Sequence, residues 1–144
     1  MRGGAFLGLA GIALAFGFTP FAVQAEDRQA AIKEATSGAV RWLALVDDGK
    51  YDASWDAASA LLQHGVTKER FSQKVGAGRK PLGKVLSRVL QWARAMTSLP
   101  GAPDGNYVVL KYETSFENKK SATETIAPML DKDGKWRVSG YYIK

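Results

Sequence analysis

Residues 107–116 read YVVLKYETSF, and this stretch is the clearest sign of the fold class. Apolar or weakly polar residues alternate along it with more polar ones. An extended chain directs successive side chains to opposite faces, so the alternation predicts a strand with one buried face. The predicted inward set is Val108, Leu110, Tyr112, Thr114 and Phe116.

Two further strands are predicted downstream. The first is ATETIAPML at 122–130, and the second is KWRVSGYYI at 135–143. Between them lies DKDG at 131–134, which is typical of a hairpin loop. Pro128 has no amide hydrogen, so it predicts a sheet edge or a bulge. Gly140 interrupts the last strand and predicts either a bulge or the close approach of another backbone.

The chain before these strands has a helical period. Apolar residues recur every three or four positions over 27–48, which predicts one helix with a single buried face. A second helix is predicted with Asp52 as its N-cap. Thr67 is expected to cap a third, with Val66 and Phe71 packing as a hydrophobic staple at its start.

The apolar residues of 84–97 fit a helix better than a strand. The residues at helical spacing are Val85, Leu86, Val89, Ala93 and Met96. Periodicity alone therefore favours a helix over a strand for this segment. The stretch LPGAPDGN at 99–106 ends it in a loop, because prolines and glycines interrupt both kinds of element.

The first 25 residues predict an export signal. Arg2 precedes the apolar run AFLGLAGIALAFGF at 5–18, and VQA at 23–25 places small or modest residues where a signal peptidase cuts. We expect cleavage after Ala25 and a periplasmic or secreted protein without a membrane span. An uncleaved anchor is the weaker alternative, because glycines and Pro20 interrupt the run and no basic cluster follows it.

Residues 26–144 are predicted to form a single domain, long enough for a hydrophobic core and too short for two. The chain has no cysteine, which excludes disulfides, a thiol nucleophile and a thiolate metal site. Without Arg2, 19 Lys and Arg face 14 Asp and Glu, a net charge of +5. These cations are scattered along the sequence, so we expect them to favour solubility and expect no nucleic-acid partner.

Several short motifs occur in an order that resembles a known family. They are WLALVDDGKYDASW at 42–55, RKPLG at 79–83, LPGAPDGNYVVL at 99–110, SFENK at 115–119, ET at 124–125 and DGKWRVSGYY at 133–142. From about Ala31 to the C-terminus, the chain resembles a family of small exported bacterial proteins known as domain of unknown function 4019.

The resemblance implies a fold but no activity. It implies an α+β domain in which about three N-terminal helices pack on a curved antiparallel sheet of about four strands. This arrangement is similar to cystatin-like or nuclear-transport-factor-2-like proteins. The resemblance also makes 84–97 the first strand, and on that basis we predict a strand there.

Few residues have the spacing that chemistry requires. His64, the single histidine, stands at a predicted helix end, where the helix dipole accounts for a cation. DKDG at 131–134 begins like a calcium loop but lacks the later acidic ligands. We therefore predict no catalytic residue, no metal site and no cofactor.

Arg88 and Glu124 are charged residues on predicted strands with apolar neighbours. They could face a pocket between sheet and helices, with Tyr112 or Tyr141 as an aromatic wall, and these four are the predicted ligand-binding residues. The alternative is that Arg88 and Glu124 form a structural ion pair or point into solvent.

The sequence leaves three functional hypotheses. The first is a non-enzymatic binding or interaction module of the cell envelope, with a small ligand or an envelope protein as its partner. The second is a small pocket enzyme that uses a carboxylate and tyrosines for acid–base chemistry. An isolated buried Glu124 would favour the enzyme, and a Glu124–Arg88 pair would argue against it. The third is a structural protein that forms a homodimer through the open face of its sheet.

Overall fold

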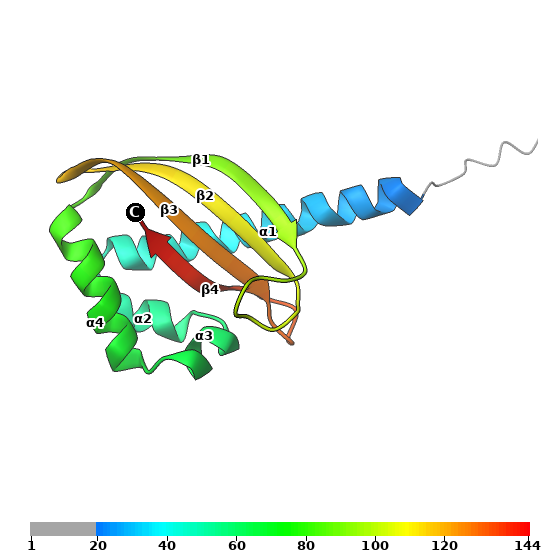
Figure 1. The fold of residues 1–144 in the computed structure, drawn as a ribbon, viewed down its shortest axis with the longest axis horizontal. Coiled ribbons are helices and arrows are strands. Elements are labelled where there is room, and N and C mark those ends of the chain that lie inside the picture. Colours follow the sequence, from blue (N-terminus) through cyan, green and yellow to red (C-terminus); the bar gives the residue numbers. More distant parts are fainter. Residues whose placement is uncertain (1–19) are drawn as a thin grey trace, which may run out of the picture.

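The computed structural model describes residues 20–144. In this part of the chain, four α-helices precede a four-stranded antiparallel sheet, which confirms the predicted α+β class. Figure 1 shows the sheet curving around the long first helix, with the shorter helices grouped beside the last strand. The predicted export signal, residues 1–25, lies outside the described residues except for 20–25, and its cleavage stays a prediction.

Helix α1, Pro20–Asp47, packs against the concave face of the sheet. It is already helical before Asp27, the expected start. Its buried residues recur at helical spacing: Ala35, Ala39, Trp42, Leu43 and Val46. At Gly38 an added Cβ would lie 3.2 Å from the carbonyl oxygen of Trp136, so helix and sheet pack closely there.

The predicted second helix is two helices, α2 (Tyr51–Asp56) and α3 (Ala60–Gly65). The chain turns extended at Ser59, whose hydroxyl caps α3 by accepting the N–H of Leu62. The Ser59 N–H donates to the Val138 carbonyl at 2.9 Å, so this amide bonds to the last strand and not to a continuing helix. Asp52 was predicted as an N-cap and lies instead in the first turn of α2.

The expected start of the next helix is confirmed. In α4, Lys68–Arg79, the Thr67 hydroxyl accepts the N–H of Arg70. Phe71 is buried, and Val66 packs against the core beside it. None of the helices in residues 20–144 combines the length and the apolar character needed to cross a bilayer.

A short 3-10 turn, η1 (Lys80–Leu82), leads into the sheet. The strands are β1 (Val85–Met96), β2 (Tyr107–Phe116), β3 (Lys119–Leu130) and β4 (Trp136–Ile143). They lie in the order β1-β2-β3-β4, so β1 and β4 form the two edges. The predicted inward residues of β2 are all buried, which confirms the pattern read from YVVLKYETSF.

Strand β1 is confirmed although its periodicity favours a helix. Its pairing with β2 shifts register between Val85 and Ser87 and again between Leu90 and Trp92. Each shift inserts an extra residue and moves the inward positions by one, so the two-residue period of a strand is lost. Of the residues at helical spacing, only Val85 and Ala93 lie opposite inward residues of β2, whereas Leu86, Val89 and Met96 are exposed, so the helical period did not mark a buried face.

Of the two alternatives predicted for Pro128, a sheet edge or a bulge, the structure shows the bulge, since β3 lies inside the sheet. Ala127 pairs with Gly140 and Pro128 pairs with Val138, so Ser139 is the extra residue of β4. A Cβ added at Gly140 would lie 3.8 Å from that of Ala127, an ordinary contact. Of the two alternatives for Gly140, the structure therefore shows a bulge beside it and no unusually close backbone.

Candidate functional site

The strand register brings the four predicted ligand-binding residues onto one face of the sheet. Arg88 of β1 lies opposite Thr114 of β2, and Tyr112 lies opposite Glu124 of β3. Tyr141 of β4 lies opposite Ile126, the next inward residue after Glu124. All four therefore point to the concave side, where α1 packs.

Glu124 is fully buried and fully hydrogen-bonded. Its Oε1 accepts from Arg88 Nε at 2.7 Å and from the Thr114 hydroxyl at 2.6 Å. Its Oε2 accepts from Arg88 Nη2 at 3.3 Å and from the Tyr141 hydroxyl. A carboxylate has about four acceptor positions, so these partners leave Glu124 none for a ligand.

Two residues that the sequence did not single out complete a buried ion network of Asp47, Arg79, Arg88 and Glu124. Asp47 accepts from Arg88 Nη1 at 2.7 Å and Nη2 at 2.9 Å, and from Arg79 Nη2 at 3.2 Å. Arg79 also donates to the Gly83 carbonyl at 3.1 Å. Two cations and two carboxylates balance, which is what charges inside a protein require.

A sequence signal for Asp47 did exist. It lies four residues after Leu43, so both share one side of α1, and Leu43 belongs to the buried face. An acidic residue at the end of an apolar helix face predicts a cationic partner in the core. Arg79 gives no comparable signal, because its partner lies far away along the chain.

Burial and the neighbouring charges shift the pKa of Arg88 and of the two tyrosines beside the network. Burial acts to lower the pKa of Arg88, but the hydrogen bonds to Asp47 and Glu124 outweigh it and raise that pKa above its usual value. Burial, reinforced by Glu124, raises the pKa of Tyr141 far above its usual range. Burial also raises the pKa of Tyr112, whose hydroxyl has no hydrogen-bond partner among the described residues.

This arrangement favours a structural role. The network ties the end of α1 to the end of α4 and to strands β1 and β3, which are distant in sequence. A ligand role for Arg88, Tyr112, Glu124 and Tyr141 stays a prediction, and the Arg88–Glu124 pair is the arrangement that argues against an enzyme.

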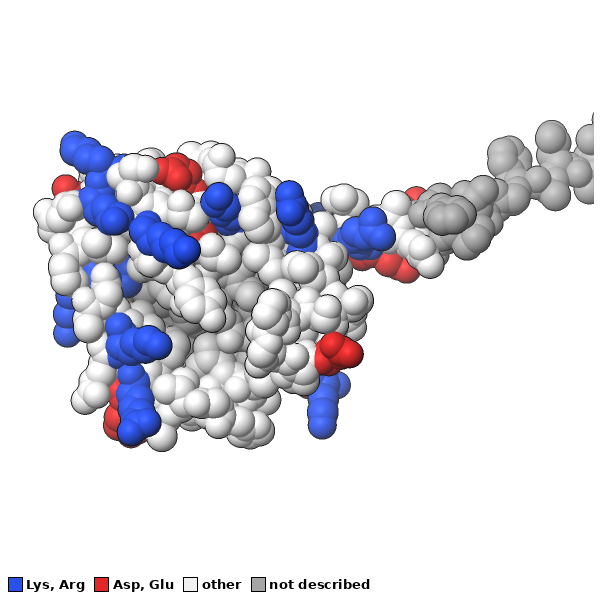
Figure 2. All heavy atoms as spheres, viewed as in Figure 1, with Lys and Arg blue, Asp and Glu red and all other residues white. Residues whose placement is uncertain are grey.

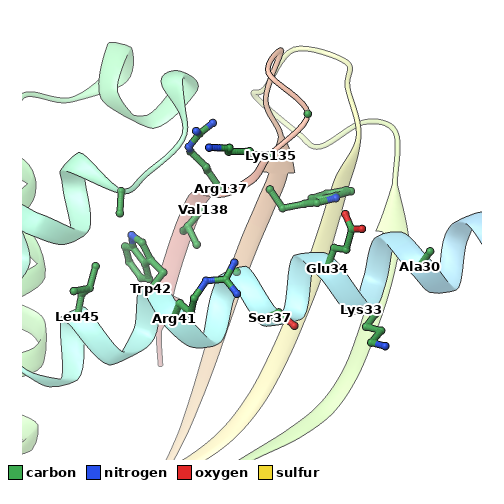
Figure 3. A pocket seen from close by; sticks show the side chains of 14 residues that line it. Ala30, Lys33, Glu34, Ser37, Arg41, Trp42, Leu45, Lys135, Arg137 and Val138 are labelled. Atoms are coloured by element: carbon green, nitrogen blue, oxygen red, sulfur yellow. The ribbon is translucent and has the colours of Figure 1, made fainter.

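A separate groove of about 810 Å³ lies between α1 and the β3–β4 hairpin, and we call it the α1–hairpin groove. Figure 3 shows Arg41 rising from α1 on the side of the hairpin that carries Lys135 and Arg137, with Trp42 and Val138 nearby. None of the four predicted residues lines this groove.

The cations of this groove differ in how they are paired. Arg137 binds Asp131 at 2.9 Å and Asp133 at 2.8 Å, and its hydrogen bonds lower the pKa of Asp133 to about 2. Arg41 and Lys135 form no ion pair with any residue in 20–144. Lys33 and Glu34 of α1 also line the groove without an ion pair inside residues 20–144. Three unpaired cations and one unpaired carboxylate therefore leave the groove with an excess of positive charge, which the prediction of a hairpin loop at 131–134 did not anticipate.

Elsewhere in residues 20–144, the cations and acids form no comparable site. On the face shown in Figure 2, lysines and arginines are spread over several elements, as the sequence predicted. His64 lies exposed in the last turn of α3. Within the described residues, no group of three or more histidine and acidic side chains could hold a metal ion.

Comparisons with known proteins address the family alone. Neither the curated proteins nor the solved structures include a match to this chain. The predicted grouping with cystatin-like or nuclear-transport-factor-2-like proteins therefore stays a prediction. The model of one family, described as a protein of unknown function (DUF4019), matches residues 38–141, which span the sheet and most of the helices. The chain therefore belongs to the DUF4019 family.

Proposed function

We propose that this protein is an exported, non-enzymatic binding module of the cell envelope, and that its α1–hairpin groove binds an anionic ligand. One observation carries the proposal: Arg41 and Lys135, which form no ion pair in residues 20–144, line the same groove as the partly exposed Trp136.

The two sides of the groove offer complementary contacts. Arg41 from α1 and Lys135 from the hairpin supply positive charge, which exceeds the single unpaired carboxylate of the groove, that of Glu34. Trp136 is half-buried, so part of its ring is open to a ligand. A molecule with an acidic group and an apolar part can satisfy both features, and pockets of this kind commonly bind such molecules.

The buried network supports a binding role over catalysis. A general acid or base must reach its substrate within hydrogen-bond distance. Glu124 has its acceptor positions filled by Arg88, Thr114 and Tyr141, so it presents no open oxygen. The acid–base hypothesis depended on this carboxylate, and no other residue was predicted to replace it.

The predicted export signal supports an envelope location, where anionic groups belong to phospholipids and polysaccharides. Both present phosphate or carboxylate oxygens, which Arg and Lys side chains bind. The proposed ligand is therefore an envelope anion that carries an apolar part.

Fluorescence titration with anilinonaphthalene sulfonate, an anionic aromatic probe, tests the groove directly. The double variant Arg41→Ala/Lys135→Ala should bind the probe about tenfold more weakly, equivalent to about 1.4 kcal/mol. The control, Arg70→Ala/Lys132→Ala, removes the same charge from exposed positions outside the groove and should bind as the parent does.

Equal loss in both double variants would mean that the probe senses net charge alone, and no loss in either would reject the groove. Mass spectrometry under native conditions, on protein purified from its own envelope, then addresses the natural ligand. A lipid-sized or saccharide-sized adduct that the groove variant lacks would identify its class.

A further inference from the structure

Exposed apolar side chains gather at one edge of the sheet. Among the described residues, four of the large exposed hydrophobics lie on β1: Leu86, Val89, Leu90 and Met96, at 58%, 56%, 41% and 42% exposure. Val40 of α1 is 55% exposed, and Tyr142 lies on the opposite edge strand. Isolated exposed hydrophobics are common, but a cluster along one element indicates an interaction surface.

Val40 belongs to the same surface. It precedes Asp47 by about two helical turns, so the two residues share one side of α1. Asp47 binds Arg88 of β1, which shows that this side of the helix faces β1. Val40 therefore flanks the β1 edge on the concave side, the side of Leu90, whereas Val89 lies on the opposite face of the sheet.

The backbone of β1 is also open to a partner. Within residues 20–144, β1 pairs with β2 alone, so its outer N–H and C=O groups have no strand beside them (Figure 1). The other edge, β4, is shorter, and the Ser59 N–H already occupies its Val138 carbonyl. Long apolar edges are usually protected in soluble proteins, and β1 has only its two bulges.

We infer that β1 pairs antiparallel with the β1 of a second copy of this chain, which joins the two sheets into one continuous sheet. A two-fold axis near Leu90 would place the central apolar residues of both copies against each other, as a self-complementary interface requires. The backbone groups of the two edges would then pair on either side of the bulge between Leu90 and Trp92.

Charge selects the antiparallel direction. Residues 85–96 contain Arg88 and Arg94 and no acidic residue, and Arg88 is held inward by Asp47 and Glu124. A parallel, in-register pair would place Arg94 beside Arg94. In the antiparallel pair each Arg94 lies about 13 Å from the axis, at roughly 3.3 Å per residue. The two cations are then about 25 Å apart, beyond the screening length of about 8 Å in physiological salt.

The available area suits a moderately stable dimer. At these exposures, the five apolar side chains offer on the order of 500 Å² per copy, compared with about 800 Å² in a typical specific interface. The strand backbone and the partly exposed Trp92 supply the remainder. We therefore expect an equilibrium between monomer and dimer that depends on concentration.

Sedimentation velocity on the purified chain across a wide concentration range tests this. The mass should rise from one chain to two, and Val89→Lys should weaken the association at least about tenfold by placing a charge in the interface. Tyr142→Lys, which removes an exposed apolar side chain from the other edge, is the matched control and should associate as the parent does. Circular dichroism of each variant confirms that it is folded.

A cross-link gives an independent measurement, because the chain has no cysteine. Leu90→Cys lies next to the proposed axis and should form an intermolecular disulfide under mild oxidation, since paired strands bring such residues to about 5.5 Å. Tyr142→Cys is more exposed and should not. The inference is overturned if the parent stays monomeric throughout, if both lysine variants weaken association equally, or if both cysteine variants cross-link equally.

Discussion

Replacing Arg88 with alanine should destabilise this protein more than replacing Glu124, although the two residues form one ion pair. Arg88→Ala leaves Glu124 at 0% exposure with hydroxyl partners and no cation, which costs about 3–5 kcal/mol. Glu124→Ala leaves Arg88 with both hydrogen bonds to Asp47, at 2.7 and 2.9 Å. Its cost is therefore nearer the ~2–3 kcal/mol of lost charged hydrogen bonds.

The two variants should also differ in their response to pH. A buried carboxylate without a cation takes up a proton more readily than it does in the unfolded chain. The folded state of Arg88→Ala then binds more protons than the unfolded state, so its stability should rise as pH falls from about 8 to about 5. Glu124→Ala has no such carboxylate and should lack this gain.

Urea unfolding followed by tryptophan fluorescence at both pH values measures these effects, since the chain has four tryptophans. The double variant Arg88→Ala/Glu124→Ala should cost less than the sum of the singles, because the stranded charge is gone. Arg94→Ala, on the exposed part of β1, is the control and should lose under about 1 kcal/mol.

Additive single effects below about 1 kcal/mol each would refute a structural network. Preserved stability together with lost ligand binding would instead support the predicted ligand role of Arg88 and Glu124.

Three further predictions concern other parts of the chain. Burial raises the pKa of Tyr141, so its neutral hydroxyl should stabilise the folded protein below about pH 10. Above that pH the free energy of unfolding should fall by up to ~1.4 kcal/mol per pH unit. Tyr141→Phe should flatten this alkaline loss of stability, and an unchanged dependence of stability on pH would contradict the prediction. Gly83→Ala should lower the free energy of unfolding, measured by urea titration, by ~1–2 kcal/mol. The reason is that φ is +76° at this position and the new Cβ would lie 3.0 Å from Glu117. Its control, Gly78→Ala in α4, meets nothing within 4 Å and should stabilise by ~0.5–1 kcal/mol; the reverse order would reject this reasoning. N-terminal sequencing of protein from its own cells should begin at Glu26, whereas Met1 on membrane-bound material would exclude cleavage.

The sequence by itself determined the parts of the fold that depend on near neighbours. The alternation in YVVLKYETSF identified β2 and its buried face, and the Thr67 cap marked the start of α4. These patterns arise from the periods of the strand and the helix, which each segment carries in its own residues. The missing amide of Pro128 likewise predicted a sheet edge or a bulge, and the strand register decided for the bulge.

Long-range register decided the rest. Asp47 meets Arg88 across 41 positions of sequence, and Arg88 meets Glu124 across 36. A register shift by one residue would turn Arg88 to the opposite face, so the network exists because both bulges of β1 place it inward. The α1–hairpin groove likewise depends on where α1 crosses β4 at Gly38. Tertiary structure alone decides these long-range contacts, because the periodicity of a segment does not specify which distant residue its side chains will contact.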